Sequence, residues 1–289
     1  MKLLTILAWC PVLLLIATTN LLLANDAVKG FWFNGAEINR YELSQSRYGQ
    51  QHPGHVEFIF VTEPFLTKQL VKNETGSAPS TDVLKLNALR TFNTGIYSYR
   101  TMTSTFRPID LEAYPHALKT TTSVQDWCGQ AFQSIYRSEN GWNVELRSYF
   151  EREGDRNYDL AESWLEDELW LLVRLDPKKL PTGTIQVVPG AVVTRFDHLP
   201  IRPYTATAEL VHNSGLSTYI LNYTELKKSL EITFDRDFPH IIRSWQETSP
   251  RGITKATLTH RVMNSSYWSE NRSSDRVLRK QLGLDPIAD

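Results

Sequence analysis

Residues 131–150 read AFQSIYRSENGWNVELRSYF, and this stretch decides the fold class. Two strand-like runs, Ala131 to Ser138 and Trp142 to Phe150, flank the pair Asn140-Gly141. An Asn-Gly pair between two such runs is the strongest short-range signal of a two-residue hairpin turn, because both residues tolerate a positive φ. The stretch therefore predicts two antiparallel strands joined by a tight turn.

The same design repeats along the chain. His52-Pro53-Gly54 is a predicted turn between residues 36–48 and 56–61, and Asn93-Thr94-Gly95 is another between 85–92 and 96–106. Further strand-like runs cover residues 116–127, 184–188, 191–196, 204–211, 217–223, 229–234, 240–247 and 254–262. The connections are short and do not alternate with helices, which favours an antiparallel sheet. Because so many strands must protect their edges, we expect an all-β fold: a barrel, a strongly curved sheet or a two-sheet stack.

One helix is predicted to interrupt the strands, at about residues 160–173. Asp159 is its expected cap, Glu162 completes something like a capping box, and Asp176-Pro177 ends it. Its apolar residues recur at helical spacing and are Leu160, Trp164, Leu165, Leu169 and Leu172. We expect this stripe to pack on the sheet, and the acids of residues 166–168 to lie on a solvated face. A short helix is also expected near the C-terminus, from Asp275 to Leu282.

The N-terminus predicts export. Lys2 is followed by an uncharged apolar run from Leu3 to Leu23, and Ala24 supplies a small residue at a cleavage position. We expect a signal peptide over residues 1–24 and a single β domain over residues 25–289. The alternative is an uncleaved membrane anchor, since about 20 apolar residues span a bilayer. The predicted location is the periplasm or the exterior, or the membrane surface if the segment stays uncleaved.

Cysteine use and charge narrow the class of protein. Cys10 lies too early for a lipoprotein cleavage site, and Cys128 is the other cysteine of the chain, so the mature protein forms no internal disulfide. We expect Cys128 to be buried and inert. The chain has 31 Lys and Arg against 32 Asp and Glu, a balance that argues against a nucleic-acid partner.

Candidate chemistry centres on acidic residues. Carboxylates that face each other can hydrolyse glycosides, and the candidates are Glu151, Asp155, Glu166 and Glu168. Asp155 also begins a spacing similar to a calcium loop, but Leu160 stands where the loop requires glycine. A thiolate pair of Cys128 with His116 is a weaker alternative. We expect no metal ion and no cofactor.

Aromatic residues suggest a ligand groove instead of a reaction centre. Large curved sheets enclose apolar cavities that suit hydrophobic ligands. The groove candidates are Tyr97, Trp127, Cys128, Tyr149 and Trp164. The expected partner is a lipid or another envelope component.

Several strings together resemble a known family. They are Phe92-Asn-Thr-Gly-Ile-Tyr-Ser-Tyr99, Ser123-Val-Gln-Asp-Trp-Cys-Gly129, Ser148-Tyr-Phe-Glu151 and Glu166-Asp-Glu-Leu-Trp170, the last leading to Leu180-Pro-Thr-Gly183. The combination is similar to an uncharacterised family of bacterial exported proteins and lipoproteins, common in Bacteroidetes and often labelled septum formation inhibitor Maf. The Ser-Pro-Arg-Arg-type motif of true Maf nucleotide pyrophosphatases does not occur in this sequence. The resemblance therefore implies export but supplies no reaction, substrate or site residue.

Two functions remain open at this point. The first is a non-catalytic protein of the cell envelope that binds a hydrophobic ligand or a partner. The second is a hydrolase of envelope glycans or lipids that uses acidic residues near 151–168.

Overall fold

The computed structural model describes residue 28, residues 30–76 and residues 78–284. The predicted export signal, residues 1–24, and Cys10 lie outside the described residues. No helix in the described part of the chain is both long enough and apolar enough to cross a membrane.

The described chain is mainly β-strand. The first eight strands are β1 (Ala36–Arg47), β2 (Gln50–Leu66), β3 (Val71–Lys72), β4 (Ser80–Thr94), β5 (Tyr97–Pro108), β6 (Lys119–Asp126), β7 (Gly129–Ser138) and β8 (Gly141–Ser148). The other eight are β9 (Arg156–Ala161), β10 (Trp164–Leu165), β11 (Gly183–Val188), β12 (Tyr204–Asn213), β13 (Leu216–Tyr223), β14 (Lys228–Asp235), β15 (Ile242–Ser249) and β16 (Gly252–Ser265). Residues 30–33 are helical before β1, and the later helical elements are α2 (Glu166–Leu175), α3 (Ala191–Asp197) and the 3₁₀ segments η1 (Pro177–Lys179) and η2 (Ser273–Leu282).

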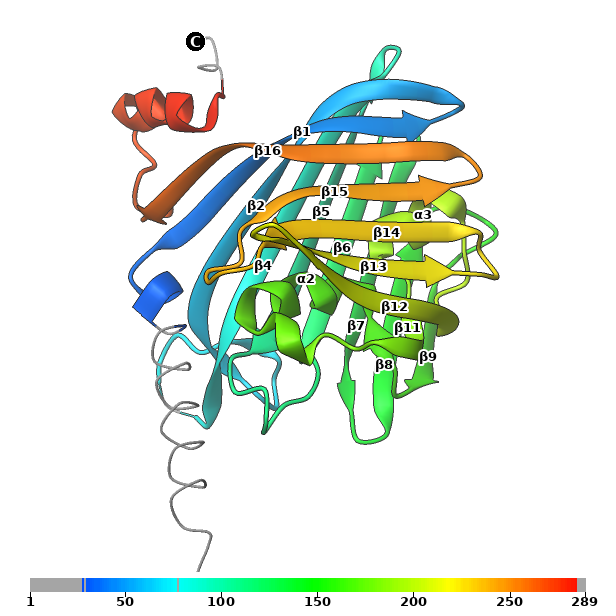
Figure 1. Ribbon diagram of the computed structural model, residues 1–289, viewed down its shortest axis with the longest axis horizontal. Coiled ribbons are helices and arrows are strands. Elements are labelled where there is room, and N and C mark those ends of the chain that lie inside the picture. The colour runs from blue at the N-terminus through cyan, green and yellow to red at the C-terminus, as the bar shows by residue number, and fades with distance from the viewer. Residues whose placement is uncertain (1–27, 29, 77, 285–289) are drawn as a thin grey trace, which may run out of the picture.

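All the strands belong to one strongly curved sheet (Figure 1). Its order is β10-β11-β12-β13-β14-β15-β16-β1-β2-β4-β5-β6-β7-β8-β9, with β3 paired to β2 outside this path. The two edge strands, β9 and β10, are consecutive in the chain and only two residues separate them. The sheet must therefore curl until its first and last strands come close, and this confirms the expected all-β, barrel-like curvature.

Side chains fill the seam between the two edges. Val144 of β8, Leu165 of β10 and Ile201 belong to one buried cluster. Trp142 Nε1 donates to the carbonyl of Ser163 at 2.9 Å, and the Tyr158 hydroxyl donates to the carbonyl of Ile201 at 2.9 Å. These contacts hold the edges together by packing and by side-chain hydrogen bonds.

The hairpin predicted at Asn140-Gly141 forms, but its two-residue turn is Glu139-Asn140, and Gly141 begins β8 and pairs with Ser138. The predicted turn at His52-Pro53-Gly54 is wrong, because these residues lie inside β2. The turn falls at Tyr48-Gly49, where both residues have positive φ, 53° and 74°. Gly54 is needed for another reason: a Cβ there would lie 2.4 Å from the carbonyl oxygen of Thr91 on the neighbouring strand.

One predicted helix and one predicted strand also need correction. The inner helix begins at Glu166, and residues 156–161 instead form β9 against β8, with Trp142 opposite Leu160. The predicted strand over residues 191–196 is the short helix α3, which follows Gly190 and ends where His198 takes a left-handed conformation. Both predictions were wrong because the spacing of apolar residues in a short segment does not distinguish a strand from a buried turn of helix.

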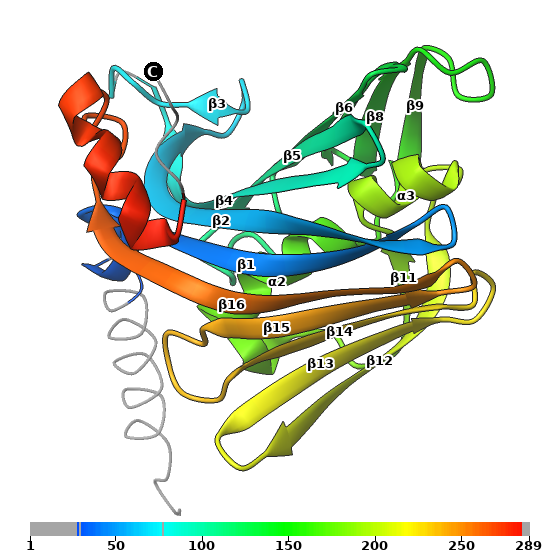
Figure 2. The same ribbon diagram turned by 90° about the horizontal axis from the view of Figure 1, so that it is seen from above.

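Helix α2 lies inside the curve of the sheet (Figure 2). Leu169 and Leu172 of the predicted stripe are fully buried in the main core, whereas its members Leu160, Trp164 and Leu165 lie in β9 and β10 and not on the helix. Trp170 contacts the stacked pair of Phe58 and Trp245, with ring centroids 5.5 and 5.3 Å away. The space inside the curve of the sheet is therefore occupied by α2 and its core contacts.

Candidate functional site

A pocket opens where several hairpin turns gather at one end of the sheet. The turns β1–β2 and β15–β16 lie together at this end, at the right of Figure 2, and α3 lies inside them. The pocket, called here the mouth pocket, has a volume of about 540 Å³ and is lined by the β1–β2 and β15–β16 turns, Tyr99, the β6–β7 turn and α3. This volume is in the range of small-molecule sites.

Ion pairs fix most of the charged walls of the mouth pocket. Lys228 Nζ lies 2.6 Å from an oxygen of Asp197, and Arg251 Nη1 lies 3.4 Å from the other. The guanidinium of Arg195 stacks on the ring of Phe150 at 3.8 Å and lies 3.6 Å from Glu153. These pairs anchor α3 to β14, to the β15–β16 turn and to the β8–β9 loop.

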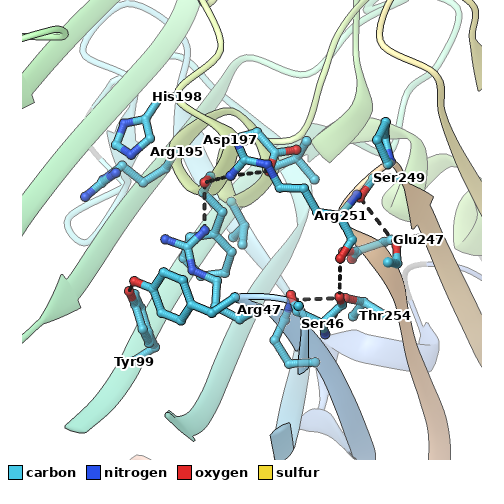
Figure 3. Close-up of a pocket in the computed structure, with 18 of the residues that line it drawn as sticks. Ser46, Arg47, Tyr99, Arg195, Asp197, His198, Glu247, Ser249, Arg251 and Thr254 are labelled. Carbon is cyan, nitrogen blue, oxygen red and sulfur yellow. Dashed lines mark hydrogen bonds and ion pairs between the residues drawn. The ribbon is translucent and has the colours of Figure 1, made fainter. Parts of the chain in front are cut away.

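Arg47 stands in a box of aromatic rings (Figure 3). Its guanidinium carbon lies 4.7 Å from the ring centre of Tyr48, 5.4 Å from that of Tyr99 and 4.8 Å from that of Phe196. Nη1 donates to the carbonyl of Phe196 at 2.7 Å. The rings hold the cation by cation–π attraction and fix its position at the pocket wall.

Three tyrosine hydroxyls meet beside Arg47. The Tyr97 hydroxyl donates to that of Tyr48 at 3.0 Å, and the hydroxyls of Tyr48 and Tyr99 lie 2.7 Å apart. Burial opposes ionisation of Tyr48, but the hydrogen bonds from Tyr97 and Tyr99 and the charge of Arg47 outweigh it and lower the Tyr48 pKa. Burial and the same hydrogen bonds raise the pKa of Tyr99, so the cluster favours negative charge on Tyr48 alone.

A small inner cavity of about 60 Å³ lies next to the mouth pocket, and Val192, Val193 and Glu247 line both. Glu247 is held by Arg90, with the closest oxygen 2.6 Å from Nη2. Arg90 also donates to Gln45 at 3.0 Å. This part of the pocket lining is therefore polar, and Arg90 holds Glu247 and Gln45 in place.

Two acids of α2 border the inner cavity: Glu166 is buried and Asp167 is half-buried. The Tyr223 hydroxyl donates to Glu166 at 2.7 Å, and the backbone N–H of Ala191 donates to Asp167 at 3.2 Å. Burial raises the pKa of Glu166 to about 7 and that of Asp167 to about 6. Glycine at position 190 allows the backbone before α3 to lie close to the Glu166 carboxyl group, since a Cβ there would be 2.6 Å from Glu166 Oε1.

The structure brings part of the predicted groove together. The Tyr97 hydroxyl belongs to the tyrosine cluster beside Arg47, and Cys128 lines the mouth pocket. The ring of Tyr149 packs on Gly129, the residue after Cys128. Trp127 is 71% exposed at the tip of the β6–β7 turn. Trp164 lies elsewhere and packs on His116, with ring centroids 4.5 Å apart.

The predicted acids do not share one cleft. Glu151 and Asp155 are exposed in the β8–β9 loop, whereas Glu166 faces the inner cavity. Glu168 is 0% exposed and is held by Arg107, by His116 Nδ1 at 2.9 Å and by the backbone N–H groups of Ala117 and Leu165. The prediction that the acids of residues 166–168 lie on a solvated face is therefore wrong. Glu166 and Glu168 are buried because the helix lies inside the curved sheet.

The prediction for Cys128 is also wrong, because this thiol is exposed. The reason is that Trp127-Cys128 forms the turn between β6 and β7 instead of continuing a strand. His116 precedes β6, and the eight residues of that strand separate it from Cys128 by about 26 Å at strand rise. The two residues therefore do not form a catalytic pair.

Sequence reasoning missed Arg47, Arg195 and α3. Arg47 follows an alternating strand and Arg195 lies in a segment predicted as a strand, so neither stood out as a pocket residue. Gly49 could have indicated the site, because a glycine directly after a strand-like run predicts a turn. A turn at Tyr48-Gly49 places Arg47 at the end of its strand. In the described part of the chain, no three His, Cys, Asp or Glu side chains are grouped to hold a metal ion.

Comparisons with known proteins support the fold alone. No protein-family model matches the chain. No curated protein matches it either. Among solved structures, the crystal structure of a beta-barrel-like protein of the domain of unknown function DUF1849 from Brucella abortus is similar, with a TM-score of 0.51 and 9% sequence identity. The match covers 81% of this chain and 99% of that one, and therefore extends over most of the curved sheet.

Proposed function

We propose that this protein is an exported, non-catalytic binding protein of the bacterial cell envelope, and that its small amphiphilic ligand occupies the mouth pocket. The observation that carries the proposal is the pocket itself, about 540 Å³ in volume with aromatic walls and fixed charged groups. Ligand pockets combine apolar surface with a few placed polar groups in this way. Export by residues 1–24, and kinship with the exported bacterial family that the sequence resembles, are parts of the same proposal.

The arrangement of polar groups supports binding more than catalysis. Lys228, Arg251 and Arg195 are engaged in ion pairs with carboxylates, and Glu247 is paired with Arg90. Groups fixed in this way orient a ligand but are not free to exchange protons. Glu151 and Asp155, half of the predicted acid set, are exposed in the β8–β9 loop.

The binding test uses a fluorescent amphiphile, a dansyl-labelled fatty acid. Val193 lines both the mouth pocket and the inner cavity, so Val193→Trp should fill the space and weaken binding at least tenfold. Val211→Trp, on the exposed part of β12, adds the same ring away from the pocket and should bind like the wild type. Equal binding by both variants would reject the mouth pocket as the binding site.

Export is tested separately by N-terminal sequencing of the protein from the periplasm or medium. The mature chain should begin at Asn25. A retained Met1 would favour the uncleaved anchor.

A hydrolase is the second candidate, and the raised pKa of Glu166, about 7, favours it. A carboxyl group that stays protonated near neutral pH can act as a general acid. If Glu166 has this role, Glu166→Gln removes hydrolysis of envelope glycans or lipids while leaving ligand binding intact. The absence of any Glu166-dependent turnover with these substrates would reject the hydrolase.

A further inference from the structure

Arg47 differs from the other cations of the mouth pocket. The other arginine and lysine side chains that line it, Arg195, Lys228 and Arg251, each have a carboxylate within 4 Å. Arg47 makes no ion pair with a carboxylate of the described residues, although aromatic rings surround it. Its Nε is buried and has no hydrogen-bond partner there either. Within the described part of the chain, no carboxylate therefore neutralises the positive charge of Arg47 at the pocket wall.

We propose that Arg47, together with the hydroxyl groups of Tyr48, Tyr97 and Tyr99, forms an oxyanion subsite that binds the phosphate, sulfate or carboxylate group of the ligand. This inference rests on the proposed function, because it specifies the polar end of the ligand in the mouth pocket. The three hydroxyls lie 2.7 and 3.0 Å apart and now donate mainly to one another. Each can rotate its proton toward an incoming anion.

The chemistry of this subsite favours an oxyanion over a neutral polar group. A guanidinium presents several N–H donors in a plane, which matches the oxygens of a phosphate, sulfate or carboxylate group. Hydrogen bonds to a charged acceptor are about twice as strong as those between neutral groups. The rings of Tyr48, Tyr99 and Phe196 restrict the motion of the guanidinium, so little freedom is lost on binding.

A purely structural role for Arg47 is the competing explanation. Arg47 and Arg251 both donate to the carbonyl of Phe196, at 2.7 and 3.1 Å, and so stabilise the end of α3. If this were the only role, removing the charge would lower stability without changing ligand preference. Preference between a charged and an uncharged ligand therefore separates the two explanations.

The experiment measures the affinities of octyl phosphate, 1-octanol and inorganic phosphate by calorimetry. Wild-type protein should bind octyl phosphate at least tenfold more tightly than 1-octanol. Arg47→Gln should abolish this preference by weakening the binding of octyl phosphate at least tenfold. Arg243→Gln removes the same charge from an exposed ion pair at the opposite end of β15, and it should keep the preference.

Conservative variants keep the test valid if Arg47→Gln unfolds. Tyr97→Phe and Tyr48→Phe each remove one hydroxyl near the surface, and each should reduce the preference for octyl phosphate about threefold or more. An unchanged preference in Arg47→Gln and in both tyrosine variants would overturn the subsite, while the proposed function would stand. Binding of inorganic phosphate alone, lost in Arg47→Gln, would support the subsite but reject an amphiphilic ligand. Binding of none of the three would contradict both proposals.

Discussion

The hydroxyl of Tyr223 donates a 2.7 Å hydrogen bond to Glu166, joining the end of β13 to the first turn of α2 inside the curved sheet. Both side chains are buried, and Asp167 follows directly in the chain. Burying an acid without a cationic partner favours its protonated form. We therefore expect the stability of the folded protein to depend on the protonation of Glu166.

Stability should therefore fall as pH rises from about 4.5 to about 7. The folded protein holds the Glu166 proton up to a pKa of about 7, whereas the unfolded chain releases it near the usual 4.5. The difference corresponds to roughly 3 kcal/mol of stability that is present below pH 4.5 and lost above pH 7. Asp167, with a pKa raised to about 6, acts in the same direction. Urea unfolding at pH 5 and pH 8 measures the effect.

Glu166→Gln should remove the Glu166 share of this pH dependence and leave that of Asp167, because a glutamine does not titrate. Glu151→Gln, in an exposed turn, is the matched control and should retain the wild-type slope. Equal slopes for Glu166→Gln and the wild type would show that Glu166 ionises normally in the folded protein.

Glu168 should be among the most sensitive positions of the fold. Arg107, His116 and two backbone N–H groups converge on its carboxylate, and these partners together lower its pKa in spite of burial. Because Glu168→Ala leaves the buried Arg107 unpaired, it should cost about 3–5 kcal/mol in the free energy of unfolding. Glu112→Ala breaks an exposed pair with Lys179 and should cost less than about 1 kcal/mol. Similar small losses for both variants would mean that the buried pair contributes little.

Leu169 tests the packing of α2 within the sheet. It is 0% exposed, and Leu169→Ala should cost about 2–5 kcal/mol because a cavity remains. Val277→Ala, on the exposed side of η2, should change stability by less than about 0.5 kcal/mol. A loss below 1 kcal/mol for Leu169→Ala would be inconsistent with a helix enclosed by the sheet.

Cys128 should react rapidly with Ellman's reagent in the native protein. The thiol is exposed in the β6–β7 turn, so labelling of a Cys10→Ser chain should proceed at similar rates with and without urea. Bound ligand should slow the reaction, because Cys128 also lines the mouth pocket. Labelling that requires denaturant would mean that the turn is covered.

The sequence was sufficient for the antiparallel sheet but not for the interior. Asn140-Gly141 predicted the hairpin between β7 and β8, although the turn falls one residue earlier, at Glu139-Asn140. The burial of Glu168 could not be predicted, since its partner Arg107 lies 61 residues away in the chain and charged helix residues are usually exposed. The short helix α3 was likewise missed, because tertiary contacts and not a long apolar period define it.

The candidate site was predictable only in part. Of the predicted groove residues, Cys128 lines the mouth pocket, Tyr97 contacts it through its hydrogen bond to Tyr48, and Tyr149 packs on Gly129 in the β6–β7 turn. Arg47 and Arg195 were missed, because only the register of β1 and the position of α3 place them at the pocket wall.

Native mass spectrometry of the protein purified from its own cell envelope tests the central claim most directly. The account predicts that wild-type protein and Val211→Trp carry the same bound small molecule, and that Val193→Trp, with a filled mouth pocket, does not. The adduct should also carry an acidic group. A wild-type protein without any adduct, or an adduct that Val193→Trp retains in full, would contradict a ligand in the mouth pocket.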